Sequence, residues 1–213
     1  MSMPDRAACL VSARMSGTFG PMHERLHAGS DGVVRCSWCA DDDLYQRYHD
    51  TEWGVTLHGE NKVFEKITLE GMQAGLSWIT ILRKRETFRE AYSNFDIEKV
   101  AAFDDADVAR LMANPGVIRN GAKINAAISN ARVTYDMLAA GISLDALVWS
   151  FAPKPVGSGV GLSDPIHAET AESKAMSKEL KKRGFRFVGP TTMYAFMQSS
   201  GMVNDHIIGC HRT

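Results

Sequence analysis

The 213-residue sequence lacks long apolar runs, an abundance of cysteine and an excess of either charge. No run approaches the roughly 18 apolar residues that a membrane-spanning helix needs. Four cysteines are too few for the disulfide framework of a small secreted domain. With 24 Lys and Arg against 25 Asp and Glu, no global basic field indicates nucleic-acid binding, so a DNA partner would be held by local patches. We therefore expect a cytoplasmic protein with no membrane contact.

The sequence does contain enough apolar material for a core, at 45% of its residues. This content and the chain length predict one large domain or two small ones. Residues 1–33 are polar, contain Gly and Ser and show no periodicity, so we expect a mobile N-terminal extension, within which Met15 or Met22 is an alternative start. Residues 34–213 show mostly helical spacing, interrupted by a Pro/Gly-rich loop at 152–172, and predict an all-α domain.

The most informative stretch is residues 69–78, at the end of a helix predicted to begin near residue 61. It continues a face that is apolar except for one acid, formed by Val63, Ile67, Glu70 and Ala74. A carboxylate on such a face must be neutralised, hydrogen-bonded or placed opposite a cationic ligand, because burying it bare is costly. Gly75 ends this helix and Trp78 begins the next, so an acid and an indole face each other across a tight turn.

A simpler interpretation of this stretch needs no ligand. Lys66 precedes Glu70 by one helical turn, and the two side chains can form a solvated ion pair worth only a few tenths of a kcal/mol. Trp78 is then an ordinary core residue. Other parts of the chain are needed to choose between the two interpretations.

Cysteine and histidine pairs near both ends of the helical region have the spacing of metal ligands. Cys36 and His49 are separated by twelve residues, and His206 with Cys210 forms an H-x3-C pair that one turn can present to zinc. Two thiolates and two imidazoles make a closed tetrahedral site, which stabilises a fold and leaves no open position for chemistry. We expect one structural Zn2+ that joins the first ordered segment to the last.

Other interpretations of these residues stay open. Cys39 or His211 can replace one of the four ligands, although a pair as close as Cys36 and Cys39 would leave His49 without a role. Cys36 and Cys39 also form the C-x2-C pattern of thiol oxidoreductases, but that motif needs a strand-to-helix setting in a βαβ unit, and no strand pattern precedes it. The four residues can also be unrelated, because spacing alone does not make a metal site.

A second helix pair is predicted at about residues 105–131, with Asp104 as the cap of its first helix. Pro115 and Gly116 break the chain between the two helices. The unpaired backbone N–H groups at the start of the second helix can cradle a phosphate, and the side chains of Arg119 and Lys123 add positive charge there. An ordinary αα-hairpin has the same pattern and is the commoner structure.

Four sequence blocks together resemble one family, the bacterial 3-methyladenine DNA glycosylase I proteins, a zinc-containing branch of the helix-hairpin-helix glycosylases. In chain order the blocks are Tyr48-His49-Asp50 with Glu52-Trp53-Gly54, Leu69-Glu70-Gly71 with Gln73-Ala74-Gly75-Leu76-Ser77-Trp78-Ile79, Leu180-Lys181-Lys182-Arg183-Gly184-Phe185, and Val203-Asn204-Asp205-His206. The resemblance implies a helix-hairpin-helix DNA glycosylase fold for residues 34–213, with a zinc site joining its N- and C-terminal segments.

The resemblance also implies roles for individual residues. The implied zinc ligands are Cys36, His49, His206 and Cys210. The implied catalytic residue is Glu70, in a base pocket made by Trp38, Tyr45, Tyr48 and Trp78. The implied DNA-binding residues are Gly75 and Leu76, which would enter the gap left by a flipped nucleotide, and Gly116, Val117, Arg119 and Lys123 in the hairpin.

The implied activity is hydrolysis of the N-glycosidic bond of 3-methyladenine in alkylated double-stranded DNA, which releases the free base and leaves an abasic site. Because no lysine lies in the central stretch as a Schiff-base nucleophile, we expect a monofunctional enzyme that does not cleave the strand. We also expect a monomer. Two other functions remain: a zinc-stapled module that senses alkylated bases without cutting, and a thiol oxidoreductase based on Cys36 and Cys39.

Overall fold

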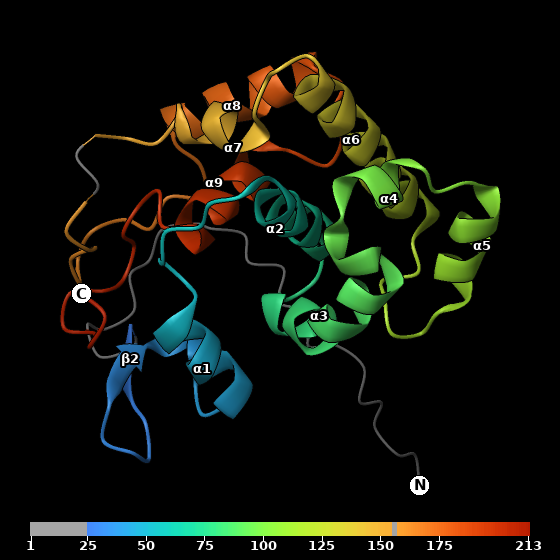
Figure 1. Cartoon of the computed structure of the whole chain (residues 1–213). Helices are drawn as coiled ribbons and strands as arrows, with labels where there is room; N and C mark the ends of the chain where they lie inside the picture. The colour runs from blue at the N-terminus through green and yellow to red at the C-terminus, as the bar shows by residue number, and fades with distance from the viewer. Residues whose placement is uncertain (1–24, 155–156) are drawn as a thin grey trace, which may run out of the picture.

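Helix α2 (Glu60–Gln73) lies in the middle of the structure (Figure 1). The helices that pack against it include α3 (Trp78–Ala91), α6 (Gly121–Ala139), α7 (Leu144–Trp149) and α9 (Pro190–Ser199). Its side chains Val63, Phe64 and Ile67 are at most 1% exposed. The helix predicted from residue 61 is therefore confirmed, and Glu70 lies on a helix that is enclosed by others. Of the predicted buried face, Val63, Ile67 and Glu70 are buried, whereas Ala74 follows the last residue of α2 and is exposed.

The computed structural model describes residues 25–154 and 157–213. The other elements in this part of the chain are β1 (Leu26–Ala28), β2 (Val34–Cys36), η2 (Ser37–Cys39), α1 (Asp43–Thr51), η3 (Ser93–Phe95), α4 (Ile97–Ala101), α5 (Asp105–Ala113) and α8 (Ala171–Lys182). The mostly helical architecture confirms the predicted class, with a small sheet added to it. Among the described residues, no helix combines the length and apolar character needed to cross a membrane.

Strands β1 and β2 form a two-stranded antiparallel sheet in which Leu26 pairs with Cys36. The predicted extension over residues 1–33 is thus wrong at its C-terminal boundary, since residues 26–28 belong to this sheet. Strands of three residues carry too little alternation to be recognised in a sequence. Residues 1–24, with the alternative starts Met15 and Met22, lie outside the described residues.

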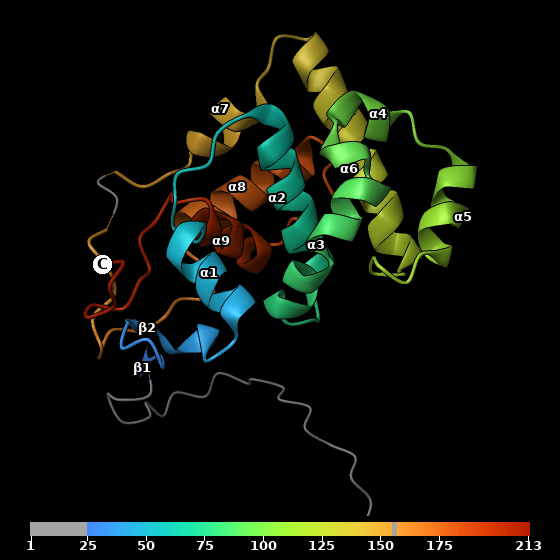
Figure 2. The same cartoon turned by 60° about the horizontal axis from the view of Figure 1, so that its bottom comes forward.

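The C-terminal segment returns to this sheet. The backbone N–H of His211 donates to the carbonyl of Val34 at 2.9 Å. Both views place the C-terminus beside the sheet, whereas α5 lies at the opposite end of the molecule (Figures 1 and 2). The first and last described segments are therefore joined, as the sequence predicted.

Helices α5 and α6 form the predicted helix pair. The side chain of Asp104 accepts hydrogen bonds from the first turn of α5, and the backbone N–H of Asp104 donates to the side chain of Asp107, so the predicted cap is confirmed. Asn120 caps α6 in a similar way. Helix α6 runs past the predicted end near residue 131 because its buried side continues to Met137.

Candidate functional site

A cavity of about 310 Å³ opens beside α2, and it is lined by residues from α1, α2, α3, α9 and η2. Five of the lining residues are those predicted for a base pocket: Trp38, Tyr45, Tyr48, Glu70 and Trp78. The volume lies at the small end of the range for small-molecule sites. The structure thus brings the predicted acid and the predicted aromatic side chains to one place.

The Glu70 carboxylate is buried, with 4% of the residue exposed. Ser199 Oγ, at the end of α9, donates a 2.8 Å hydrogen bond to Glu70 Oε1. Burial raises the pKa of Glu70 to about 7, although the Lys66 charge and the Ser199 hydroxyl pull it back. Loss of solvation is the physical cause, because a carboxylate in low dielectric favours its neutral form. The cavity therefore holds an acid whose ionised form is favoured by a nearby positive charge.

Aromatic rings enclose this acid. The centroids of Tyr48 and Trp78 lie 5.5 Å apart, and those of Trp38 and Tyr45 lie 4.8 Å apart. Trp38 also meets Tyr48 edge-on at 6.4 Å. Electron-rich ring faces attract cations by about 0.5–2 kcal/mol each. Acid and rings together favour a flat, positively charged ligand over a neutral one.

Trp38, Tyr45, Tyr48 and Trp78 form the aromatic wall of the cavity. Two of its polar groups, the Tyr45 phenol and the Trp78 indole N–H, have different surroundings. Burial raises the pKa of Tyr45 to about 12, so its phenol stays neutral at physiological pH. The indole Nε1 of Trp78 is buried and has no hydrogen-bond partner among the described residues. Buried donors without a partner are uncommon in folded proteins. The pocket wall thus offers one unused donor.

Lys66 lies against the aromatic wall instead of forming the solvated pair of the simpler interpretation. Its side chain is partly buried, and its Nζ donates to the hydroxyl of Tyr48 at 3.3 Å. The same Nζ is 5.1 Å from the Tyr48 ring centroid and 5.2 Å from that of Trp78. Burial lowers the pKa of the Lys66 ammonium, while Glu70 and Glu52 oppose this effect.

The turn from α2 to α3 lies between two residues that line the cavity, Gln73 and Trp78, and its residues 74–77 are exposed. Gly75 adopts φ +79°, a conformation that L side chains rarely take, so glycine is needed here for its backbone. Leu76 is 43% exposed. An exposed apolar side chain on a tight turn has the shape of a wedge.

The turn between α5 and α6 is tightly held. An added Cβ on Gly116 would lie 2.2 Å from Thr87 Cγ2, so only glycine fits there. Lys84 Nζ donates to the carbonyl of Pro115 at 2.7 Å, which fastens α3 to this turn. The Val117 side chain is buried, so only its backbone can reach a ligand, whereas Arg119 is exposed.

Lys123 does not occupy the position that a phosphate contact requires. It is only 8% exposed, and its Nζ donates to the carbonyls of Met72 and Ala74 at 2.8 and 2.6 Å. The Lys123 side chain therefore has protein partners in place of the DNA phosphate that was predicted for it. Its ammonium caps the C-terminal end of α2, where the carbonyl groups of a helix lack internal partners.

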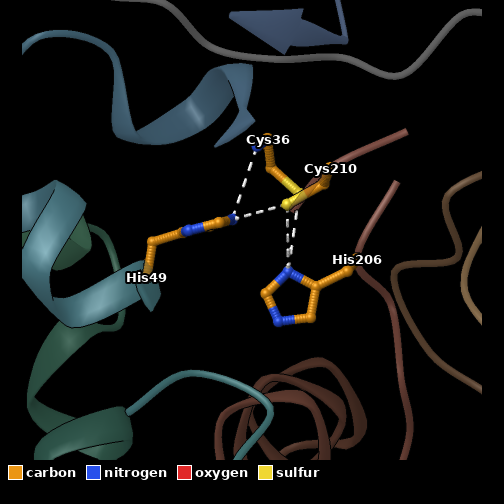
Figure 3. Close-up of side chains that lie close together, drawn as sticks. All are labelled: Cys36, His49, His206 and Cys210. Carbon is orange, nitrogen blue, oxygen red and sulfur yellow. Dashed lines mark hydrogen bonds between the residues drawn. The ribbon is translucent and has the colours of Figure 1, made fainter. Parts of the chain in front are cut away.

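The four predicted metal ligands converge on one point between α1, the end of β2 and the C-terminal segment (Figure 3). One donor atom from each of Cys36, His49, His206 and Cys210 lies within 4.8 Å of all the others. The Cys210 Sγ is 3.4 Å from His49 Nε2 and 3.8 Å from His206 Nδ1. All four residues are buried. The cluster is a buried group able to hold a metal ion.

The atoms around the cluster fit a metal site as well. His49 Nδ1 lies 2.8 Å from Asp50 Oδ1, and His206 Nε2 lies 3.3 Å from the carbonyl of Trp53. Partners of this kind fix the ring that presents its other nitrogen to a metal. The backbone N–H groups of Ile207 and Arg212 point at the sulfurs of Cys36 and Cys210. Burial raises the pKa of Cys36 to about 12, a cost that a cation would offset.

The two alternative ligands have other partners. The Cys39 thiol donates to the carbonyl of Cys36 at 3.1 Å, and His211 Nε2 lies 2.8 Å from Asp50 Oδ1. Cys36 and Cys39 are free thiols. The strand β2, which ends at Cys36, belongs to a hairpin and not to a βαβ unit. The geometry therefore favours the original set of four.

A comparison with known families matches the methyladenine glycosylase model over residues 38–213. The chain belongs to the methyladenine glycosylase family. DNA-3-methyladenine glycosylase 1 of Escherichia coli (strain K12) is 50% identical over 180 residues, which cover 84% of this chain and 96% of that protein.

Solved structures of the methyladenine glycosylase family have the same fold. A crystal structure of a 3-methyladenine DNA glycosylase I superposes with a TM-score of 0.79 at 49% identity, covering 83% of this chain and 98% of that one. The enzyme from Staphylococcus aureus, solved to show the structural basis of 3-methyladenine recognition, has a TM-score of 0.77 at 34% identity, with 83% and 95% covered.

Some residues of this methyladenine glycosylase site were missed by sequence reasoning. They line the cavity without having been predicted: Trp53, Gln73, Gln198 and Ser199. Gln73 is one turn from Glu70 and was open to prediction by helical spacing. Ser199 was not, because it is 129 residues away from the carboxylate that it contacts.

Proposed function

We propose that this chain hydrolyses the N-glycosidic bond of 3-methyladenine in alkylated double-stranded DNA, releasing the free base and leaving an abasic site. The observation that carries this proposal is the buried Glu70 carboxylate inside an aromatic cavity. The names of the family and of its relatives support the reaction class. The assignment of individual residues rests on the geometry of the site.

Charge provides the selectivity in this proposal. N3-methyladenine in DNA is cationic, and Glu70 and the ring faces of Tyr48 and Trp78 attract a cation. Glu70 also accepts hydrogen bonds from the amino-bearing edge of the base. Neutral adenine gains none of the charge–charge attraction, so it is rejected even though its shape is similar. Glu70 therefore acts chiefly by recognising the damaged base.

The chemistry needs little acid catalysis because a cationic base is a good leaving group. Water attacks the sugar carbon as the bond to the base breaks, and the base departs with its electron pair as a neutral molecule. No lysine of the described chain lines the cavity. A Schiff-base route to strand cleavage thus has no nucleophile there, which supports a monofunctional enzyme.

The substrate must enter the cavity as a flipped nucleotide, since a base within the duplex is out of reach. In this proposal the exposed Leu76, supported by the turn at Gly75, fills the gap that the nucleotide leaves. The backbone at Gly116 and Val117 and the side chain of Arg119 hold a phosphate of the DNA. Lys123 contributes indirectly, by fixing the end of α2 that carries the wedge.

Cys36, His49, His206 and Cys210 are proposed to hold one structural Zn2+. Bound there, the ion would supply charge neutralisation for two thiolates and a cross-link between the two ends of the domain. Because four protein donors fill the coordination of the ion, hydrolysis takes place in the cavity around Glu70, which we call the base cavity. A monomer is the proposed state, because one chain contains the whole cavity.

The proposal is tested by release of 3-methyladenine from methylated DNA in single-turnover experiments. Glu70→Gln should slow release by about 10- to 100-fold, since a charged hydrogen bond contributes about 1.5–3 kcal/mol. Glu65→Gln is the matched control: this acid is on the same helix but pairs with Arg89. Release by Glu70→Gln at the wild-type rate would refute the role of Glu70. Binding of methylated DNA by the wild-type chain without any release would favour the sensing module.

A further inference from the structure

Lys66 lies next to the base cavity without lining it. The base cavity is lined by Tyr48 and Trp78, whereas Lys66 lines a second cavity of about 410 Å³, which neither ring lines. Lys66 lines the second cavity but not the first, and Ser199 lines both. The ammonium therefore stands behind the aromatic wall, in contact with both rings, without entering the space of the base.

We propose that Lys66 is a positioning residue, which fixes Tyr48 from behind and keeps the Glu70 carboxylate charged before the cationic base arrives. This inference rests on the proposed role of Glu70. It goes beyond that role, because it assigns the ionisation of the acid to a lysine that does not touch the base.

The need for such a residue follows from burial. A carboxylate that is 4% exposed takes up a proton unless a positive charge is close, and a protonated acid cannot attract a cationic base. A cation inside the base cavity would keep the acid ionised but would repel the ligand. Lys66 is one helical turn from Glu70 and behind the rings, so it supplies the charge without occupying the site.

The charge of Lys66 lowers the pKa of Glu70. Arg25 lines the base cavity, and its guanidinium donates to the carbonyls of Gly161 and Asp164. Helix α1 contributes the neutral phenols of Tyr45 and Tyr48, and α9 contributes the Ser199 hydroxyl. Lys123 of α6 is held by carbonyl groups at the end of α2. The groups facing Lys66 from the second cavity are paired: Glu52 with Arg85 and Glu65 with Arg89. Burial lowers the pKa of Lys66, and the charges of Glu70 and Glu52 oppose this effect and favour the ammonium.

The test is the pH dependence of 3-methyladenine release from methylated DNA between about pH 5 and pH 9, measured in single turnovers. Because the ionised acid is the active form, the rate falls on the acidic side. Lys66→Met should move this fall to higher pH by about one unit, which lowers the rate about tenfold at the acidic end and least at pH 9. Lys66→Gln keeps a donor for Tyr48 but loses the charge, so it should move the profile equally.

Two controls complete the experiment. Lys66→Arg retains the charge and should keep the wild-type profile. Lys62→Met removes an exposed lysine on the same helix that lines the same cavity, and should leave the profile unchanged. If Lys66→Gln and Lys66→Met follow the wild-type profile while Glu70→Gln is impaired, the role of Lys66 is refuted and that of Glu70 stands. If Glu70→Gln is unimpaired as well, the proposed function of the acid fails.

Discussion

Ser199 Oγ donates a hydrogen bond of 2.8 Å to Glu70 Oε1, which joins the last turn of α9 to the acid of the base cavity. Both residues are at most 4% exposed, so water cannot replace this bond without entering the core. The contact fixes the carboxylate and lowers its pKa relative to an unpartnered buried acid.

Ser199→Ala should therefore raise the pKa of Glu70 above about 7 and slow base release at neutral pH. The lost hydrogen bond to a charged group is worth about 1.5–3 kcal/mol, or roughly 10- to 100-fold in rate. Because the carboxylate regains its charge at higher pH, the deficit should shrink there. The rates of base release by Ser199→Ala and by the wild type at about pH 6 and pH 9 measure this change in the deficit. An equal deficit at both values would contradict the explanation.

Glu70→Gln should increase the stability of the protein at alkaline pH. The pKa of Glu70 is about 7 in the folded protein against 4.5 for an unburied glutamate, so the folded protein binds the proton more tightly. Ionisation therefore weakens the fold as pH rises between these values. The amide has no such cost, and its advantage should reach on the order of 2–3 kcal/mol above pH 7. Urea unfolding at about pH 8 and pH 5 checks this. A gain at pH 5 equal to that at pH 8 would show that ionisation is not its source.

Lys123→Met and Arg119→Ala should have opposite effects. Lys123→Met strands two backbone carbonyls and should cost about 1–3 kcal/mol in the free energy of unfolding, with the salt dependence of DNA binding unchanged. Arg119→Ala should leave stability within about 0.5 kcal/mol and reduce the salt slope by about 1. Urea titrations and DNA-binding isotherms at several salt concentrations separate the two. A reduced salt slope for Lys123→Met would restore its predicted phosphate contact.

Cys210→Ser should lose the bound zinc and much of the stability that the ion provides. A ligand at a thousandfold excess over its Kd stabilises the native state by about 4 kcal/mol, and a tightly held metal contributes at least on this scale. Elemental analysis and urea unfolding measure the two effects. Cys39→Ser is the control and should keep the ion, because its thiol bonds a carbonyl outside the cluster. Zinc retained by Cys210→Ser would exclude this thiol as a ligand.

Local patterns in the sequence predicted the parts of the site that lie close together along the chain. Glu70 was placed on a buried face because helical spacing repeats every three to four residues. The same spacing did not show that Ser199 would meet it, since this depends on how α9 packs against α2. The direction of the Lys123 side chain was hidden for a related reason: helical spacing placed its backbone, but a long side chain can turn to the surface or inward.

In the metal cluster, too, local spacing predicted some contacts, whereas others depended on how distant segments pack. Spacing within each ligand pair indicated Cys36 with His49 and His206 with Cys210, and the structure brings both pairs together. The short strand pairing around Cys36 was invisible, because three residues per strand give no readable alternation. The contact between Asp50 and the His49 ring could not be predicted either, since any acid beside a histidine looks the same in a sequence.

The cluster also sets an order of events during synthesis. Cys36 and His206 are 170 residues apart, and Trp38, which lines the base cavity, follows Cys36 two residues later in η2. A nascent chain on the ribosome thus carries one wall of its pocket long before the residues that anchor that wall have been made. Fragments released before residue 206 retain the acid-bearing helix but have no means of closing the pocket, so translation must pass this point before the repair site can take shape.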